Sequence, residues 1–289
     1  MGERSNLNIA VVGGDSRQRL VADELRKCGY TVSEYAVNEG APRVDLLPTV
    51  AKADLLVLPL PASRDGFRVN AQSDIPFDKL VGCLPQGCKI FAGKLQPALG
   101  DLLSGRGFEV FDFYEDELFE RENTDISADG AIHYLLSLFD GNIAGRSVLV
   151  CGYGRFGASL CEKLKVLTSS VTVAARRDES LEIARQNGLS VLKIDLAEKN
   201  FFSVPDGICA VLNTVPYHVF TEENMGTLEG KVYLELASAP FGGDPARLKE
   251  VSSYSYLPAI PAKFAPERAG CAMLSSLFRY IDSNFPDGV

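Results

Sequence analysis

The chain is poor in histidine, the side chain that most often serves acid–base catalysis. Its 289 residues include only two histidines, His133 and His218, and no tryptophan. No histidine–carboxylate pair in the last third of the chain matches the one with which a 2-hydroxy acid dehydrogenase moves its proton, which argues against that class of enzyme. There is also no G-x-S-x-G turn of the kind that carries the serine of an α/β-hydrolase. His218 remains an alternative acid–base candidate, whereas His133 is more typical of a packed helix residue.

Disulfides, metal clusters and membrane-spanning runs are missing as well. The seven cysteines are odd in number and form no C-x-x-C pair. This pattern is typical of reduced thiols rather than of a disulfide framework or a zinc site. No apolar run is long enough to span a bilayer, and the first residues lack the apolar core of a signal peptide. We therefore expect a cytoplasmic protein without a bound metal.

Basic residues are outnumbered by acidic ones, 29 to 38, which gives a net charge of −9. This balance argues against nucleic acid or an anionic membrane as the main partner. An anionic small molecule would have to be held by local basic groups. The chain is long enough for two domains, and its 46% apolar content is sufficient for a substantial core in each.

Short apolar segments alternate with helical patterns along the whole chain. This alternation predicts an α/β fold with two doubly wound, Rossmann-like parallel sheets joined by a crossover helix. We expect an N-terminal flavodoxin- or Rossmann-like domain over 1–122, with a C-terminal helix, 266–289, that packs back on it. Residues 123–265 are expected to form the dinucleotide-binding domain with the crossover helix. The predicted strands cover 8–12, 31–35, 54–58, 88–91, 108–111, 147–151, 171–175, 191–192, 208–213, 232–236 and 254–257.

The most specific motif is a G-x-G-x-x-G turn, Gly152-Tyr153-Gly154-Arg155-Phe156-Gly157. A predicted strand precedes it, and a helix and a second strand follow, which is the context that a dinucleotide fingerprint requires. Gly152 permits the tight turn, Gly154 lets the backbone approach a pyrophosphate, and Gly157 lets the helix pack close to the strand. The alternative is a glycine-rich βα turn that binds nothing.

Two arginines at the end of the second strand indicate which nucleotide binds. Arg176 and Arg177 stand where an NAD site usually carries Asp or Glu. Guanidinium groups offer charge and paired donors to a 2′-phosphate, so we predict NADP. Ordinary solvated charges at the start of a helix are the alternative. Later strand ends are expected to complete the cofactor site with Asn213, Thr214, Val215, Pro216 and Ala237.

The substrate site is expected outside the carboxyl ends of the strands, in a cleft that the two sheets share. Carboxylated substrates need cations, which an acidic protein must place locally. Asp15 can contact substrate or simply cap the following helix, and the sequence favours neither. The candidates at strand ends and in the proline-rich loop before the last helix are Asp15, Ser16, Arg17, Arg64, Ser238, Lys263 and Arg268.

Taken together, these segments resemble the A subunit of dipicolinate synthase, a family of bacterial sporulation proteins. The matching stretches lie in the family's order and cover nearly the whole chain. They are 10–17, 61–66, 127–132, 152–157, 174–176, 213–216, 236–238 with 242–244, and 257–270.

The resemblance implies an NADP-dependent oxidoreductase that oxidises a dihydrodipicolinate-type cyclic dicarboxylate to dipicolinate, on a branch of the lysine pathway. It also implies a second, flavoprotein-like subunit as partner. On this basis we assign catalytic roles to Asp15, Arg17, Asp129 and Lys263, and substrate binding to Ser16, Arg64, Ser238 and Arg268. Sheet edges and apolar faces favour a homodimer. A non-catalytic nucleotide-binding or regulatory subunit, or a 2-hydroxy acid dehydrogenase-like enzyme, is the alternative.

The chain departs from the family pattern at two places. It reads Leu257-Pro-Ala259-Ile-Pro-Ala262 where the family usually has Leu-Pro-Gly-x-Pro-Gly, and alanine restricts the backbone more than glycine does. It also reads Ser127-Ala-Asp129-Gly where the family usually has Thr-Ala-Glu-Gly, and Asp129 reaches one methylene less than a glutamate.

Overall fold

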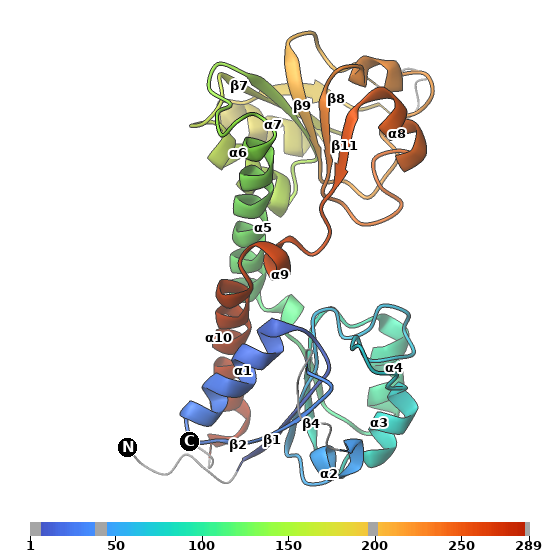
Figure 1. Ribbon diagram of the computed structural model, residues 1–289, viewed down its shortest axis with the longest axis vertical. Coiled ribbons are helices and arrows are strands. Elements are labelled where there is room, and N and C mark those ends of the chain that lie inside the picture. The colour runs from blue at the N-terminus through green and yellow to red at the C-terminus, as the bar shows by residue number, and fades with distance from the viewer. Residues whose placement is uncertain (1–6, 38–44, 196–201, 287–289) are drawn as a thin grey trace. The chain divides into compact units, whose positions relative to one another are not determined.

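The computed structural model describes residues 7–37, 45–195 and 202–286. The chain divides into two compact units, the first formed by 1–123 with 261–289 and the second by 124–260. Each unit contains one parallel sheet with helices on both faces (Figure 1), which confirms the predicted α/β fold.

The first unit has a five-stranded sheet in the order β2-β1-β3-β4-β5. This is the flavodoxin-type order, in which the direction of winding reverses between β1 and β3. The apolar residues of β3 are all buried, as expected for a central parallel strand. The strands are β1 (Asn8–Val12), β2 (Thr31–Tyr35), β3 (Leu55–Val57), β4 (Lys89–Ala92) and β5 (Val110–Asp112).

Helices from both ends of the chain cover one face of this sheet. Helix α10 (Pro266–Asn284) packs against α1 (Ser16–Lys27) (Figure 1). Its Met273 and Leu277 belong to the same hydrophobic core as the residues of β1. The expected return of the C-terminal helix to the first unit is thereby confirmed. The other face is covered by shorter helices: α2 (Leu46–Val50), α3 (Phe77–Cys83) and α4 (Pro97–Gly105).

The second unit has a six-stranded sheet in the order β11-β10-β9-β6-β7-β8. This is the Rossmann order, in which the winding reverses between β6 and β9. The glycine fingerprint follows β6 directly, so it lies at the reversal point. The strands are β6 (Ser147–Cys151), β7 (Ser170–Ala175), β8 (Ser190–Lys193), β9 (Ile208–Asn213), β10 (Val232–Glu235) and β11 (Ser253–Tyr256).

Helix α5 (Glu117–Ser137) carries the chain from the first unit into the second. Its apolar face packs with α6 (Arg155–Leu164) and α7 (Asp178–Gln186) on one side of the sheet. Helix α8 (Pro245–Val251) and the short turn η2 (Met225–Leu228) cover the other side. The remaining short elements are η1 (Phe113–Glu115) and α9 (Ile260–Phe264). Within the described residues, none of the helices has the length and apolar character needed to cross a membrane.

Candidate nucleotide and substrate sites

The fingerprint turn between β6 and α6 requires glycine at two of its three glycine positions. Gly152 has a φ of +98°, and a Cβ there would lie 2.5 Å from the Thr214 hydroxyl oxygen. A Cβ on Gly157 would overlap the carbonyl oxygen of Gly152. Gly154 is exposed at the start of α6, with open space beside its Cα. The turn therefore leaves room for a ligand at a helix N-terminus, where anions are favoured.

A cavity of about 550 Å³ opens in front of this turn. All predicted cofactor residues line it except Asn213 and Ala237. The fingerprint, the two arginines after β7 and the turn after β9 therefore line one cavity at the carboxyl ends of the strands. Residues that sequence reasoning did not assign to the site also line it: Ala174, Ala175, Ser180, Ile194, Tyr217 and Val219.

Among the described residues, no acid forms an ion pair with the two arginines at the end of β7. Arg176 and Arg177 are both exposed. The guanidinium carbon of Arg176 lies 5.1 Å from the centroid of the Tyr217 ring. Ser180, on the first turn of α7, is nearly buried and lines the same cavity. This end of the cavity is suited to an anionic group.

A buried carboxylate lies at the end of β10, next to the cavity wall. Glu235 is fully buried and accepts hydrogen bonds from the Asn213 side chain at 2.7 Å and from the backbone N–H groups of Gly242 at 2.8 Å and Ala237 at 3.1 Å. The Tyr233 hydroxyl donates a fourth at 3.3 Å. Burial raises the pKa of Glu235, while these four donors oppose the rise. Asn213 and Ala237 thus donate hydrogen bonds to this carboxylate and do not line the cavity.

This carboxylate fixes the chain that forms the cavity wall. The Asn213 amide also donates to the Val215 carbonyl at 2.9 Å and accepts from the Val215 N–H at 3.3 Å. The carbonyl of Gly242 accepts the N–H groups of Val219 and Phe220, each at 2.8 Å. The segment between Asn213 and Phe220 is therefore anchored at both ends.

Two other predicted residues of the second unit lie away from this cavity's lining. Asp129, on α5, pairs with Lys163 of α6, which also binds Asp125 at 2.7 Å. Burial lowers the pKa of Lys163, but its hydrogen bonds to the two carboxylates outweigh burial and raise it. Ser238 is exposed on the loop that follows β10. The catalytic role of Asp129 and the substrate role of Ser238 stay predictions.

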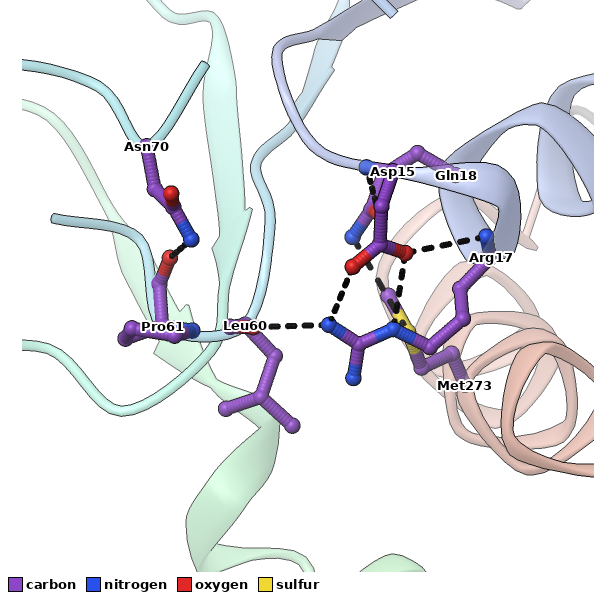
Figure 2. A network of polar contacts seen from close by, with 7 residues as sticks. All are labelled: Asp15, Arg17, Gln18, Leu60, Pro61, Asn70 and Met273. Atoms are coloured by element: carbon purple, nitrogen blue, oxygen red, sulfur yellow. Dashed lines mark hydrogen bonds and ion pairs between the residues drawn. The ribbon is translucent and has the colours of Figure 1, made fainter. Parts of the chain in front are cut away.

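In the first unit, Asp15 and Arg17 join the ends of β1 and β3 (Figure 2). Asp15 is the N-cap of α1 and forms a capping box with Gln18. The Arg17 guanidinium donates two hydrogen bonds to the Asp15 carboxylate, from Nε at 2.9 Å and from Nη2 at 2.8 Å. Nη2 also donates to the Leu60 carbonyl at 2.9 Å, just before Pro61. The contact bridges the reversal point of the sheet, where ligands of such folds bind.

The electrostatics of this pair favour an ionised carboxylate. Burial raises the pKa of Asp15, but the hydrogen bonds and charge of Arg17 outweigh burial, and the charge of Arg64 adds to the lowering. Arg17 is buried, and its Nη1 has no hydrogen-bond partner among the described residues. Asp15 therefore caps the helix and orients Arg17, which keeps one nitrogen for another acceptor.

The polar loop after β3 is ordered by its own side chains. The buried Ser63 hydroxyl accepts the Gly66 N–H at 2.9 Å and donates to Asp65 at 3.2 Å. The Asp65 carboxylate accepts the N–H groups of Phe67 and Arg68, each at 2.8 Å, and these two bonds are the main reason why its pKa falls to about 2.

A backbone hydrogen bond of 2.9 Å from Gly14 to Asn70 ties this loop to the turn after β1. The Asn70 side chain donates to the Pro61 carbonyl at 3.1 Å (Figure 2). The loop is thus part of the same strand-end site as Asp15 and Arg17.

The remaining predicted substrate residues are exposed and belong to the first unit. Ser16 follows the N-cap of α1, Lys263 lies on α9, and Arg268 lies on the first turn of α10. The start of α10 packs closely on the start of α1 at Gly270. A Cβ added to this glycine would lie only 3.4 Å from the Arg17 carbonyl oxygen. The predicted substrate cations, Arg17, Arg64, Lys263 and Arg268, are therefore all carried by one unit.

Comparison with known proteins finds two family models, each of which matches one part of the chain. Residues 8–114 match the family model for the N-terminal domain of the dipicolinate synthase A subunit, and 148–203 match the TrkA-N domain model. No curated protein sequence matches the chain.

Solved structures extend the likeness to the whole fold. The dipicolinate synthase A chain from Bacillus subtilis has a TM-score of 0.79 and 22% identity, with 96% of each chain covered. The corresponding protein from Bacillus halodurans has a TM-score of 0.78 and 22% identity, covering 97% of this chain and 99% of that one. A transhydrogenase from Sinorhizobium meliloti has a TM-score of 0.62 and 14% identity, covering 96% and 93%. The predicted resemblance to the dipicolinate synthase A subunit is confirmed.

Proposed function

We propose that this chain is an NADP-dependent oxidoreductase subunit that converts a dihydrodipicolinate-type cyclic dicarboxylate into dipicolinate. One observation carries the proposal. The cavity of the second unit combines a complete glycine fingerprint with two unneutralised arginines at the end of β7. The resemblance of the first unit to the N-terminal domain of the dipicolinate synthase A subunit supplies the substrate class.

The residues present in the cavity fit a phosphorylated dinucleotide. The open space beside Gly154, at the N-terminus of α6, suits a pyrophosphate. Arg176 and Arg177, together with the Ser180 hydroxyl, are the proposed ligands of the 2′-phosphate. An Asp or Glu that would accept the ribose hydroxyl in an NAD site is missing at this strand end. Bound NADP would accept a hydride from the ring that is oxidised.

The first unit carries the groups proposed to hold the dicarboxylate. Arg17 offers Nη1, and the exposed Arg64 lies close enough for its charge to act on Asp15. Lys263 and Arg268 would add charge for the second carboxylate. Aromatisation strongly favours loss of a hydride and a proton, so a weak base is sufficient. Asp15, kept ionised by Arg17, is the proposed proton acceptor.

A partner subunit is part of the proposal. Each of the two Bacillus proteins is named as one lettered component of a synthase, which suggests a second component for this protein as well. We further propose a homo-oligomeric state, because β5 is an edge strand of its sheet and an edge strand can pair with another chain.

A non-catalytic nucleotide-binding subunit is the second candidate. It is favoured by the observation that both acids with predicted catalytic roles, Asp15 and Asp129, form an ion pair with a cation of the same unit. The 2-hydroxy acid dehydrogenase alternative is less well supported. The His218 ring is bound to the Pro240 carbonyl at 3.0 Å and has no carboxylate partner among the described residues.

The test has two stages. Titration with NADPH and NADH, followed by nicotinamide fluorescence, is expected to show tighter binding of NADPH. The dihydrodipicolinate-type substrate is then generated in situ with NADP, with and without the partner subunit, and dipicolinate and reduced cofactor are measured. Gly157→Val, which places a side chain against the Gly152 carbonyl, is the binding-deficient control. NADPH binding without turnover in either assay would favour the regulatory candidate, and tighter NADH binding would overturn the NADP assignment.

A further inference from the structure

Tyr217 lies in the segment after β9 and contacts an arginine that comes from a different strand. The residue is 41% exposed and lines the nucleotide cavity, and the centroid of its ring lies 5.1 Å from the guanidinium carbon of Arg176. Arg176 directly follows β7, so the contact joins two strand ends across the cavity. The fingerprint, which concerns the βαβ segment alone, gives no indication of this residue.

The kind of contact matters for an anion site. An aromatic ring holds a guanidinium through its flat face, and the five N–H donors in the guanidinium plane remain available. A carboxylate would hold the arginine by those same donors and would neutralise its charge. Arg176 is thus restrained without losing the charge or the donors that a phosphate requires.

The Tyr217 backbone is well placed to act as a fixed support. On one side, Val215 is held by two hydrogen bonds with the Asn213 side chain. On the other side, the His218 ring binds the Pro240 carbonyl, and the Val219 N–H binds the Gly242 carbonyl at 2.8 Å. Pro216 further limits the backbone directly before the tyrosine. The ring is therefore carried by an anchored segment, whereas the exposed Arg176 side chain has many rotamers to lose.

We propose that Tyr217 is a positioning residue that holds Arg176 ready for the 2′-phosphate of NADP, and so sets the preference for NADP over NAD. This inference rests on the proposed NADP-binding function. It predicts that the tyrosine ring contributes to the discrimination between the two cofactors rather than to dinucleotide binding in general.

The experiment compares Tyr217→Leu with Tyr217→Phe in the full chain. Leucine keeps apolar bulk without a π face, and phenylalanine keeps the π face without the hydroxyl. Dissociation constants for NADPH and NADH are measured by nicotinamide fluorescence, with 2′,5′-ADP and AMP as competitors. Tyr217→Leu is expected to raise the dissociation constants of NADPH and 2′,5′-ADP about 2- to 5-fold, the range of an exposed cation–π contact. The dissociation constants of NADH and AMP are expected to stay unchanged. Tyr217→Phe is expected to match the wild type.

A double substitution tests whether the tyrosine acts through the arginine. In the Arg176→Ala background, Tyr217→Leu is expected to have no further effect on NADPH, because the group that it positions is gone. Equal weakening of NADPH and NADH by Tyr217→Leu would overturn the proposal and make the ring a common wall of the adenosine site. An undiminished effect in the Arg176→Ala background would overturn it too. Failure of the wild type to bind either nucleotide would instead refute the proposed function itself.

Discussion

The side-chain amide of Asn213 donates a 2.7 Å hydrogen bond to the carboxylate of Glu235, and both residues are completely buried. They end neighbouring parallel strands, β9 and β10, in register with each other. Burial of an isolated charge destabilises a protein, but four hydrogen-bond donors surround the Glu235 carboxylate and offset this cost. The pair connects the segment that lines the nucleotide cavity with the loop that follows β10. The cavity wall thus depends on a polar core that a bound nucleotide need not touch.

Glu235→Gln is expected to destabilise the protein although it keeps the size of the side chain. The new amide would turn its NH₂ group toward donors, so that at least one of the hydrogen bonds from Asn213, Gly242 and Ala237 is lost. We expect the free energy of unfolding to fall by about 1–3 kcal/mol, as for a buried donor left without an acceptor. Urea denaturation measures this loss.

The matched control is Glu229→Gln, at an exposed site in the same unit. It should change the free energy of unfolding by no more than about 0.5 kcal/mol. If the two variants have equal free energies of unfolding, the Glu235 carboxylate does not stabilise the segments that follow β9 and β10.

The secondary structure was largely accessible from the sequence. The segments 8–12, 31–35, 147–151 and 208–213 were predicted with the bounds that the structure has, because each is a short run rich in apolar or β-forming residues between turn residues. Helix α3 (Phe77–Cys83) was missed, since it has only two turns and follows a loop without apolar periodicity.

The polar core at the ends of β9 and β10 could not be predicted in the same way. A glutamate at a strand end is usually exposed, and the Asn213 amide that receives Glu235 lies 22 positions earlier in the chain. Likewise, Arg17 was predicted as a substrate cation, but nothing local reveals its bond to the Leu60 carbonyl, 43 positions later. Contacts between strand ends arise from sheet topology rather than from local pattern.

Arg17→Ala and Arg64→Ala are expected to separate stability from substrate binding. Arg17 is buried against Asp15, so Arg17→Ala should lower the free energy of unfolding by about 1–3 kcal/mol. Arg64 is exposed, so Arg64→Ala should lower it by no more than about 0.5 kcal/mol. Both variants should raise KM for the dicarboxylate and leave the NADPH dissociation constant unchanged. Urea denaturation, steady-state kinetics and nucleotide titration provide the three values. Unchanged KM in both variants would remove these arginines from the substrate site.

The carboxyl group of Asp65 is expected to titrate near pH 2 in the folded protein. Its pKa is lowered from 3.8 to about 2, first by the N–H groups of Phe67 and Arg68 and less by the Arg68 side chain. Because the folded pKa is lowered, the ionised form stabilises the loop above pH 3.8, and this contribution is lost as the pH falls toward 2. Carbon-13 NMR of the carboxyl group measures the titration. In Arg68→Gln the pKa should stay well below 3.8, and a return to that value would mean that the side-chain charge, not the backbone, is the cause.

Ala259→Gly is expected to stabilise the protein, in contrast to the usual effect of glycine. Ala259 has a φ of +54°, a left-handed conformation that costs a residue with a Cβ about 1–2 kcal/mol. It stands where the resembling family usually has glycine. Glycine also loses more entropy on folding, by about 0.4–1 kcal/mol, so the net gain should be about 0.5–1 kcal/mol. Ala262→Gly, three residues later in α9, is the control and should lose about 0.5–1 kcal/mol, because its backbone is helical. Thermal and urea denaturation of both variants measure the difference, and a loss of stability in both would mean that the backbone at Ala259 is not strained.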